Sequence, residues 1–390
     1  MNIEISDRLK QLPPYLFVEL DRLKQEALNK GRDIIDLGIG DPDRATPEHI
    51  IKELQRSAGD SANHHYALDW GMSRLREAIA GWYNRRFDVR LDPNKEILPL
   101  IGSKEGISHI PLGFINPGDV VLVPTPGYPP YTASAIFAGA RPVFLPLLER
   151  NNFLPDLENI DRDVLNKAKM MFLNYPNNPT SATATKEFFE KVVDFADKNG
   201  IIVCHDAAYS EIYFDGNKPM SFLEVRGAKE VGVEFHSLSK TYNMTGWRIG
   251  FVSGNQQIIK GLRTVKSNID SGIFQAIQLA GIESLNGPQD SVEQMREIYQ
   301  ERRDVLVNGL NSIGWNVSKP QATFYVWAHA LDGYSSSELS KIFLEKLGIV
   351  TTPGVGFGES GEGYIRMALT VCKERIKEAV ERIAEFKKYC

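Results

Sequence analysis

The sequence predicts an α/β protein: a large domain with a mostly parallel sheet sandwiched by helices, plus a smaller α+β domain. Three observations indicate this class. Between Leu98 and Gly254 short apolar runs rich in β-branched residues recur, and stretches able to form helices separate several of them. Strands that are apolar throughout are typical of a parallel sheet buried on both faces. The chain has 390 residues, more than one hydrophobic core usually serves, so we expect two domains.

The first expected elements are a helix and a strand. Apolar residues repeat at helical spacing and a glycine follows as a C-terminal cap: Leu16, Leu20, Leu23, Ala27 and Gly31. A short apolar run over residues 33–40 then predicts a strand that ends in the turn Gly40-Asp41-Pro42.

The central part of the chain predicts the strands of the large sheet. The expected strands are Val120–Val123, Val143–Leu147, Met170–Leu173, Ile201–Cys204, Val231–Phe235 and Ile249–Val252. Thr185–Asn199 is expected to be a helix, because its apolar residues share one face.

The pattern changes after about residue 285, where long helical stretches alternate with a few strands. The last expected helix has a regular apolar face, made by Ile376, Ala379, Val380, Ile383 and Phe386. We therefore expect a small domain built from both chain ends. Residues 1–50 would form an N-terminal arm and the first part of the small domain, residues 51–285 the large domain, and residues 286–390 the rest of the small domain.

Composition excludes several classes of protein. Forty-five basic and fifty acidic residues give a net charge of −5 without blocks of like charge, so nucleic acid is not an expected partner. The three cysteines have no CxxC spacing, which suits a reducing compartment and argues against structural disulfides or a cysteine-based metal site. The N-terminus does not resemble a secretory signal, and no apolar run approaches the roughly 18 residues of a membrane span. We expect a cytoplasmic protein that binds neither membrane nor metal.

Polar residues follow several expected strands, at the sheet edge where ligands of α/β proteins bind. In Ser237-Leu238-Ser239-Lys240, with Arg248 close behind, two hydroxyls and a guanidinium can bind a phosphate beside a lysine. Such a lysine can condense with an aldehyde once burial and nearby cations lower its pKa. A solvated surface lysine is the alternative interpretation.

Asp206 and Tyr209 follow the strand that starts at Ile201, and Asn178 follows the preceding one. A carboxylate at the end of a strand is often only a helix N-cap, and Asn-Asn-Pro-Thr is often only a turn. As a site, Asp206 would hold the protonated nitrogen of a pyridine cofactor, while Tyr209 and Asn178 would donate to its ring oxygen.

Three further candidates complete the set. Ser103 and Lys104 follow Gly102 where a strand gives way to a helix, which is a common phosphate-binding arrangement. Tyr128 could stack on an aromatic cofactor, although buried tyrosines are more often simply part of the core. Arg366 lies between apolar residues, and a buried arginine there would need an anion such as an α-carboxylate.

In this order, these residues resemble the class I/II aminotransferases, which are pyridoxal-phosphate enzymes of fold type I. The resemblance covers nearly the whole chain, and the segment SLSKTYNMTGWRIG is highly specific. It implies that Lys240 forms the Schiff base with pyridoxal 5′-phosphate and shuttles the proton, with Asp206 on the pyridine nitrogen. It also implies cofactor or phosphate contacts from Ser103, Lys104, Tyr128, Asn178, Tyr209, Ser237, Ser239 and Arg248.

The resemblance further implies substrate contacts and a shared active site. Arg366 corresponds to the substrate-carboxylate arginine. Tyr66 corresponds to a tyrosine that reaches the phosphate of the neighbouring subunit, which implies a homodimer. The segments LPPYLFVELDRLKQEA, LGIGDP, IGSKEGISH and PTPGYPPY are most similar to the branch that acts on LL-diaminopimelate and 2-oxoglutarate, in lysine biosynthesis. In that branch Tyr15, Gly40, Lys104, Tyr128 and Asn178 would contact the substrate, and Asp69 its distal ammonium.

The sequence also departs from relatives of this group. The stretch from Lys266 to Gly272 lacks the arginine with which aspartate aminotransferases bind a side-chain carboxylate, and Gly272 stands where plant-type diaminopimelate enzymes have an asparagine. An alanine or glutamate–pyruvate aminotransferase, another class I specificity and a β-lyase of the same fold type remain alternatives. A regulator with a degenerate cofactor domain is disfavoured, because the lysine, aspartate and tyrosine set is complete.

Overall fold

A computed structural model of the chain describes residues 3–13, 16–67 and 70–388. Within these ranges seven strands form one sheet, in the spatial order β2-β8-β7-β6-β5-β3-β4. All of them except β8 run in the same direction. Their bounds are β2 Ile97–Leu100, β3 Val120–Thr125, β4 Arg141–Pro146, β5 Ala168–Asn174, β6 Ile202–Asp206, β7 Gly232–Ser237 and β8 Gly250–Gly254.

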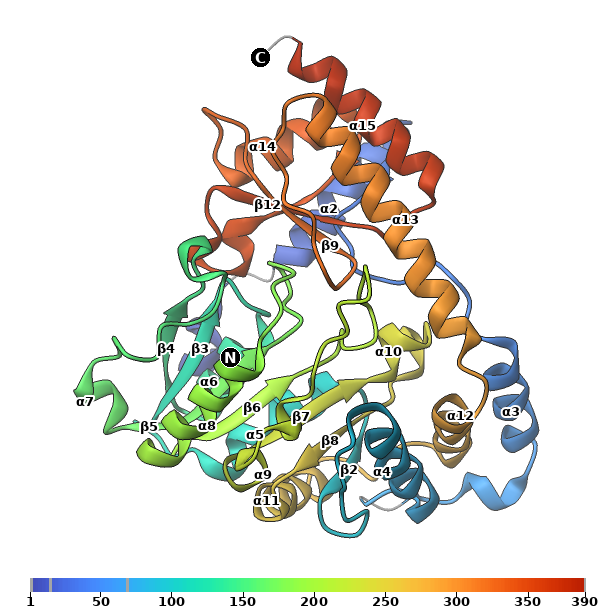
Figure 1. The fold of residues 1–390 in the computed structure, drawn as a ribbon, viewed down its shortest axis with the longest axis vertical. Coiled ribbons are helices and arrows are strands. Elements are labelled where there is room, and N and C mark those ends of the chain that lie inside the picture. The colour runs from blue at the N-terminus through green and yellow to red at the C-terminus, as the bar shows by residue number, and fades with distance from the viewer. Residues whose placement is uncertain (1–2, 14–15, 68–69, 389–390) are drawn as a thin grey trace.

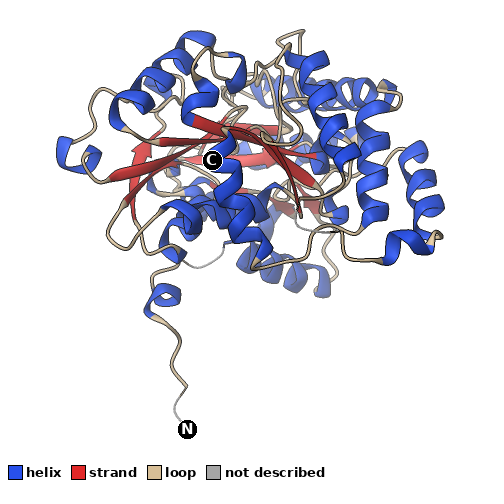
Figure 2. Ribbon diagram, turned by 90° about the horizontal axis from the view of Figure 1, so that it is seen from below, coloured by secondary structure: helices blue, strands red, loops and turns tan. Residues whose placement is uncertain are grey.

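Both faces of this sheet are buried under helices (Figure 2). In β3, Val120 and Leu122 belong to the core on one face, and Val121 and Val123 to the core on the other. Because both faces must be apolar, the strand is apolar throughout. One face is covered by α4 Ser73–Phe87, α8 Lys186–Asn199, α9 Ala228–Val231 and α12 Gln275–Asn286; the other by α5 Ser103–Phe114, α6 Pro130–Phe137 and α11 Gln256–Ser267.

A second, smaller body contains segments from both ends of the chain, as Figure 1 shows in blue and in orange to red. Its antiparallel sheet has the order β11-β12-β9, and a short parallel pair joins β1 to β10. The strands are β1 Ile35–Asp36, β9 Tyr325–His329, β10 Ile349–Val350, β11 Thr352–Pro353 and β12 Tyr364–Ala368; the helices are α2 Leu16–Asn29, α13 Asp290–Ser312, α14 Ser336–Ile342 and α15 Lys373–Lys387. The remaining α-helices are α1 Asp7–Lys10, α3 Glu48–Ala58, α7 Arg162–Leu165 and α10 Leu238–Thr241.

These elements confirm the predicted fold class. Each of the six predicted apolar runs overlaps a strand of the large sheet. The helix predicted at Thr185–Asn199 is α8, whose N-cap Thr185 accepts a hydrogen bond from the Phe188 amide. The first and last predicted helices are α2 and α15. The domain boundaries proposed at residues 50 and 285 stay a prediction.

Several predicted boundaries are wrong. Ile201 and Ile249 lie one residue before β6 and β8, and Leu147 lies one residue after β4. The strand predicted over residues 33–40 is limited to Ile35–Asp36. It ends there because Asp36 Oδ1 accepts from the amides of Gly38 and Ile39, which a sheet ladder would otherwise use. Val231, predicted as the start of a strand, instead ends α9, and β7 starts one residue later.

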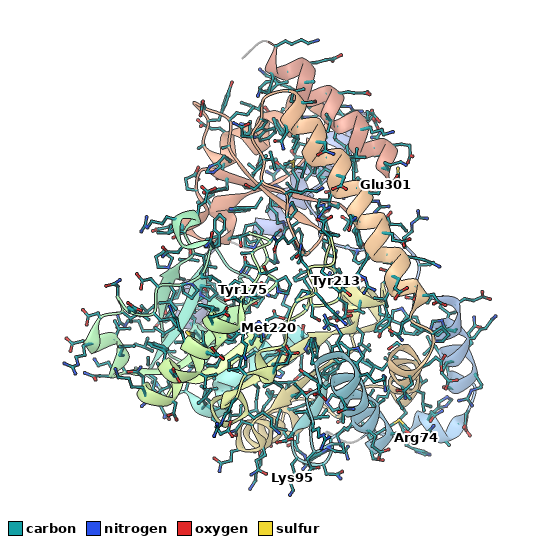
Figure 3. All side chains as sticks on the ribbon, viewed as in Figure 1. Arg74, Lys95, Tyr175, Tyr213, Met220 and Glu301 are labelled. Carbon is teal, nitrogen blue, oxygen red and sulfur yellow. The ribbon has the colours of Figure 1, made fainter. Side chains whose placement is uncertain are left out.

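Ion pairs and backbone hydrogen bonds join the two bodies. Arg303 of α13 binds both carboxylate oxygens of Asp215, at 2.6 and 3.0 Å. Tyr213, labelled in Figure 3, forms an isolated antiparallel bridge with Ala322, and the Thr323 amide donates to the Ile212 carbonyl. The small sheet is thereby fixed beside the ends of the large one. In the described ranges, no helix is both long enough and apolar enough to cross a bilayer.

Candidate active site

A cavity of about 350 Å³ lies where the carboxyl ends of the large sheet face the small body. This is where open α/β sheets bind ligands, and the size suits a small molecule. Its lining residues are Gly40, Ser103, Lys104, Tyr128, Tyr131, Asn174, Asn178, Asp206, Ala208, Tyr209, Ser237, Ser239, Lys240, Thr245, Arg248, Tyr325 and Arg366. Because the strands are parallel, motifs far apart in sequence converge here.

Most of the site residues predicted from the sequence line this cavity. Tyr66 does not line the cavity of its own chain, and 83% of its surface is exposed. Tyr15 and Asp69 lie outside the residues that the structure describes.

Lys240 extends into the cavity from α10, which begins directly after β7. Its Nζ donates a hydrogen bond to the Gly40 carbonyl at 2.8 Å. Burial lowers the pKa of Lys240 to about 8, and the positive charges of Arg366 and Arg248 act in the same direction, against Asp41. The shift from 10.5 raises the neutral fraction at pH 7 roughly 300-fold. A neutral amine is the form that attacks an aldehyde.

A concentration of hydrogen-bond donors lies beside this lysine. Gly102, at φ +74°, is the N-cap of α5, so the first amides of that helix point toward the cavity end. A Cβ on Gly102 would lie only 2.1 Å from Arg248 Nη2, so a glycine is required for the guanidinium to approach. Together with the hydroxyls of Ser103, Ser237 and Ser239, these donors fit a phosphate group.

Asp206 lies at the other end of the cavity, where β6 ends. Its Oδ2 accepts a hydrogen bond from the Tyr131 hydroxyl at 2.8 Å, and its main-chain carbonyl accepts from Asn174 Nδ2 at 2.7 Å. Its Oδ1 is buried without a hydrogen-bond partner. Burial raises the pKa of this carboxyl, partly offset by the Tyr131 hydrogen bond. A protonated ring nitrogen would satisfy the open oxygen. The described residues therefore fit a phosphorylated pyridine cofactor.

Arg366 is buried in β12, the central strand of the small sheet, and is 1% exposed. Its Nη1 donates to Asn178 Oδ1 at 2.8 Å, and its Nη2 donates to the Gly38 carbonyl at 2.6 Å. A guanidinium can only donate, so the Asn178 oxygen faces Arg366 and the amide NH₂ is left to donate elsewhere. This orientation suits an asparagine that donates to a cofactor oxygen.

Five lining residues were missed by the sequence reasoning: Tyr131, Asn174, Ala208, Thr245 and Tyr325. The first four lie within four residues of a predicted one, in PTPGYPPY, NYPNN, HDAAY and TGWR, so the motifs themselves carried a signal. Tyr325 has no such neighbour. It is brought to the cavity only by the packing of the small sheet.

The stretch that lacks an arginine, residues 266–272, forms ion pairs within the chain. Lys266 is fully buried, and its Nζ bonds Glu105 at 3.1 Å and Asp270 at 2.8 Å. Glu105 also bonds His109 and accepts from the amide of Ile101, two residues before α5. These contacts hold residues 266–270 against the first turns of α5, which contain Ser103 and Lys104.

Comparison with known proteins agrees with this geometry. Residues 32–383 match the family described as aminotransferase class I and II. A relative named LL-diaminopimelate aminotransferase, from Syntrophobacter fumaroxidans, is 59% identical over 97% of both chains. A second relative of that name, from Halothermothrix orenii, is 55% identical over 98% of both chains. The substrate-bound structure of BacF from Bacillus subtilis has a TM-score of 0.95 at 40% identity, covering 99% of this chain and 98% of that one.

Proposed function

The chain belongs to the aminotransferase class I and II family, and we propose that it transfers an amino group between LL-diaminopimelate and 2-oxoglutarate. The physiological direction would then be glutamate to tetrahydrodipicolinate, a step toward lysine. It is a pyridoxal-phosphate-dependent transaminase of fold type I. The observation that carries the proposal is that Lys240, Asp206 and Arg366 meet in one cavity.

Pyridoxal phosphate, when bound, supplies an aldehyde and an electron-accepting ring. Lys240 would hold the cofactor and, once released by the substrate, move the proton at the substrate α-carbon. Its lowered pKa supports this role, because a general base works best with a pKa close to the working pH.

The other residues would bind and orient the cofactor. Asp206 would hold a proton on the ring nitrogen, while Asn178 and Tyr209 donate to the ring oxygen. Tyr128 would lie against the ring. The phosphate would be bound by Ser103, Lys104, Ser237, Ser239 and Arg248, all of which line the cavity. Lys104 is also proposed to meet a substrate carboxylate.

Arg366 would bind the α-carboxylate of the amino donor. Its guanidinium is buried and has planar, paired donors, which is the arrangement that a carboxylate binds bidentately. Asn178 accepts a hydrogen bond from Arg366, and Gly40 lines the same cavity, so both would complete the substrate contact. The roles of Tyr15 and Asp69 stay predictions from the sequence, as does a cytoplasmic location.

A homodimer with shared sites follows from the same proposal. Tyr66 is highly exposed, and Phe274 is also exposed, with its ring 6.2 Å from that of His64, two residues before Tyr66. An exposed tyrosine remote from its own cavity suits a residue that serves the neighbouring subunit.

Mixing two inactive variants tests the shared site. In a hybrid of Tyr66→Ala and Lys240→Ala, one site would contain both wild-type residues. Random reassortment makes half of the dimers hybrid, so about a quarter of wild-type activity should return. No recovery after subunit exchange would refute the sharing.

The substrate assignment is tested with a panel of amino donors and 2-oxoglutarate. We expect glutamate formation from LL-diaminopimelate to exceed that from alanine or aspartate at least about tenfold in kcat/KM. Turnover of alanine alone would favour the alanine specificity. Pyruvate release from cystathionine would instead reveal a β-lyase.

A further inference from the structure

Tyr325 lies between two residues to which the proposed reaction assigns separate tasks. It begins β9, is 3% exposed and lines the cavity. Its hydroxyl is 3.0 Å from the hydroxyl of Tyr209. Its ring lies under the guanidinium of Arg366, with 4.2 Å between Cζ and the ring centroid. One side chain thus contacts both the proposed ring-oxygen donor and the proposed carboxylate ligand.

Two residues with unusual backbone conformations hold Tyr325 in place. Ser181 and Thr323 have φ of +62° and +67°, values that side chains with a Cβ rarely adopt and β-branched ones least of all. Their hydroxyls lie 2.9 Å apart. Ser181 Oγ donates to the Tyr325 carbonyl at 2.8 Å, and the Tyr325 amide donates to Thr323 Oγ1 at 3.0 Å. Strained residues of this kind gather where a neighbouring position must be exact for function.

The opposite side of the Tyr325 hydroxyl is fixed by Gly40. A Cβ added to Gly40 would lie 2.0 Å from Tyr325 Oη. Only a glycine at this position lets the hydroxyl reach Tyr209. The same Gly40 carbonyl accepts the hydrogen bond from Lys240 Nζ. The position of the Tyr325 hydroxyl is therefore fixed both by the hydrogen bonds of Ser181 and Thr323 to the Tyr325 backbone and by the close approach of Gly40.

We propose that Tyr325 is a positioning residue, whose hydroxyl donates to Tyr209 and whose ring supports Arg366. The inference rests on the proposed function, because it needs Tyr209 to donate to the cofactor's ring oxygen. A hydroxyl has one proton, so Tyr209 can donate there only if Tyr325 donates to Tyr209. In a chain of hydrogen bonds each donor strengthens the next, so Tyr325 makes Tyr209 the stronger donor.

The proton equilibrium at the Lys240 nitrogen responds to this chain. A hydrogen-bond donor to the ring oxygen stabilises the negative charge on that oxygen. Once the Lys240 nitrogen loses its proton, no positive charge balances the oxygen, so the donor favours the deprotonated form. Arg366 of β12 and Asp206 of β6 act on Tyr209, Asp41 and Arg248 act on Lys240, and Tyr299 of α13 interacts with Tyr325. Replacing Tyr325 by phenylalanine leaves all of these groups in place. A weaker donor would then let the nitrogen keep its proton to a higher pH.

Two substitutions separate the hydroxyl from the ring. In the holoenzyme, Tyr325→Phe should raise the pH midpoint of the cofactor's visible absorbance by about one unit, the effect of one hydrogen bond. The KM for the amino donor should change less than about twofold, because the ring under Arg366 remains. Tyr325→Leu should shift the midpoint similarly and also raise KM about fivefold or more.

Tyr299→Phe is the matched control. Tyr299 belongs to the same core, its ring lies 5.3 Å from that of Phe324, and its buried hydroxyl has no hydrogen-bond partner. This variant should leave both midpoint and KM unchanged. Thermal denaturation of each variant verifies that it is folded.

An unshifted midpoint in folded Tyr325→Phe would overturn the hydroxyl role, and an unchanged KM in Tyr325→Leu would overturn the ring's role. Equal shifts in Tyr299→Phe would mean that the effect belongs to the core in general. The absorbance midpoint needs only bound cofactor. A wild-type protein that fails to use LL-diaminopimelate would therefore refute the proposed substrate and still leave the role of Tyr325 testable.

Discussion

Asp206 and Glu234 are buried carboxylates on the neighbouring strands β6 and β7, and their surroundings are opposite. Glu234 is completely enclosed and accepts five hydrogen bonds. The donors are the hydroxyls of Tyr83 and Ser221, the amide of Phe222 and the rings of His205 and His236. Asp206 has one side-chain donor, Tyr131, and one oxygen without a partner.

The pKa values of the two carboxyl groups are shifted in opposite directions, as their surroundings would suggest. Burial alone would raise the pKa of Glu234, but the hydrogen bonds and charges of His205 and His236 hold it well below its usual range. Burial raises the pKa of Asp206, and the opposing influences, of which the Tyr131 hydrogen bond is the largest, do not reverse this. His205 and Asp206 are consecutive in β6, so the pleat sends one side chain to the core and the other to the cavity. A fully bonded buried carboxylate is structural, whereas an open one beside a cavity indicates a ligand.

The largest expected effect is the loss of turnover on replacement of Lys240, which lines the same cavity as Asp206. Lys240→Ala should lower turnover by at least about 10³-fold, because both cofactor attachment and the proton shuttle are lost. The apoprotein should melt no lower than wild type, since the lowered pKa of Lys240 shows that its charge is disfavoured in the fold. Steady-state assays and thermal melts measure the two quantities. Substantial residual turnover would remove Lys240 from the mechanism.

Conservative amides test the two carboxylates directly. Asp206→Asn should lower turnover about 10²-fold or more while the free energy of unfolding of the apoprotein is unchanged or higher. Glu234→Gln should destabilise the protein by about 3 kcal/mol, because its histidines lose a buried partner. Turnover per folded molecule should fall much less. Similar behaviour of the two variants would abolish the distinction between them.

The pH dependence of stability provides a second test of the difference between Asp206 and Glu234. The pKa of Glu234 is depressed, so its contribution is present above its unfolded value of 4.5 and is lost as pH falls below it. The pKa of Asp206 is raised, so its ionisation destabilises the fold as pH rises above 3.8. In apoprotein denaturation, the deficit of Glu234→Gln should shrink as pH falls below 4.5, whereas the advantage of Asp206→Asn should grow as pH rises above 3.8. A flat difference for either variant would contradict the assigned shift.

The smallest expected effects come from one tyrosine on each side. Tyr131 and Tyr83 are both buried and donate to Asp206 and Glu234 at 2.8 and 3.0 Å. Tyr131→Phe should lower kcat about tenfold, the effect of about 1.4 kcal/mol in the transition state. Tyr83→Phe should cost about 1 kcal/mol of stability with kcat nearly unchanged. Chemical denaturation and kinetics on both variants would show whether the effects separate in this way.

The sequence was most informative where a motif directly follows a strand. Ser103, Asp206 and Lys240 could be predicted because the carboxyl ends of parallel strands meet at one edge. Tyr325 could not, since it belongs to another sheet and reaches the cavity through Ser181, Thr323 and Gly40. The reversed direction of β8 was also hidden, because an apolar run does not encode its orientation.

The Glu234 network escaped prediction for a related reason. His205 precedes Asp206 in the sequence and is paired with Glu234 across the strands. The sequence does not show which residues a polar side chain inside an apolar strand contacts, or which face of the sheet it lies on. The sheet register places His205 beside Glu234, and the packing of α4 and of residues 221–222 against β7 brings Tyr83, Ser221 and Phe222 to it.

The protonation state of the cofactor's ring nitrogen tests the contrast most directly. Pyridoxal phosphate labelled with ¹⁵N at the ring would be bound to wild type and to Asp206→Asn, and its chemical shift measured by NMR across neutral pH. A protonated nitrogen in wild type, and an unprotonated one in the variant, is the predicted result, because the open oxygen of Asp206 is where the proton would be held. An unprotonated nitrogen in the wild type would contradict the role of Asp206.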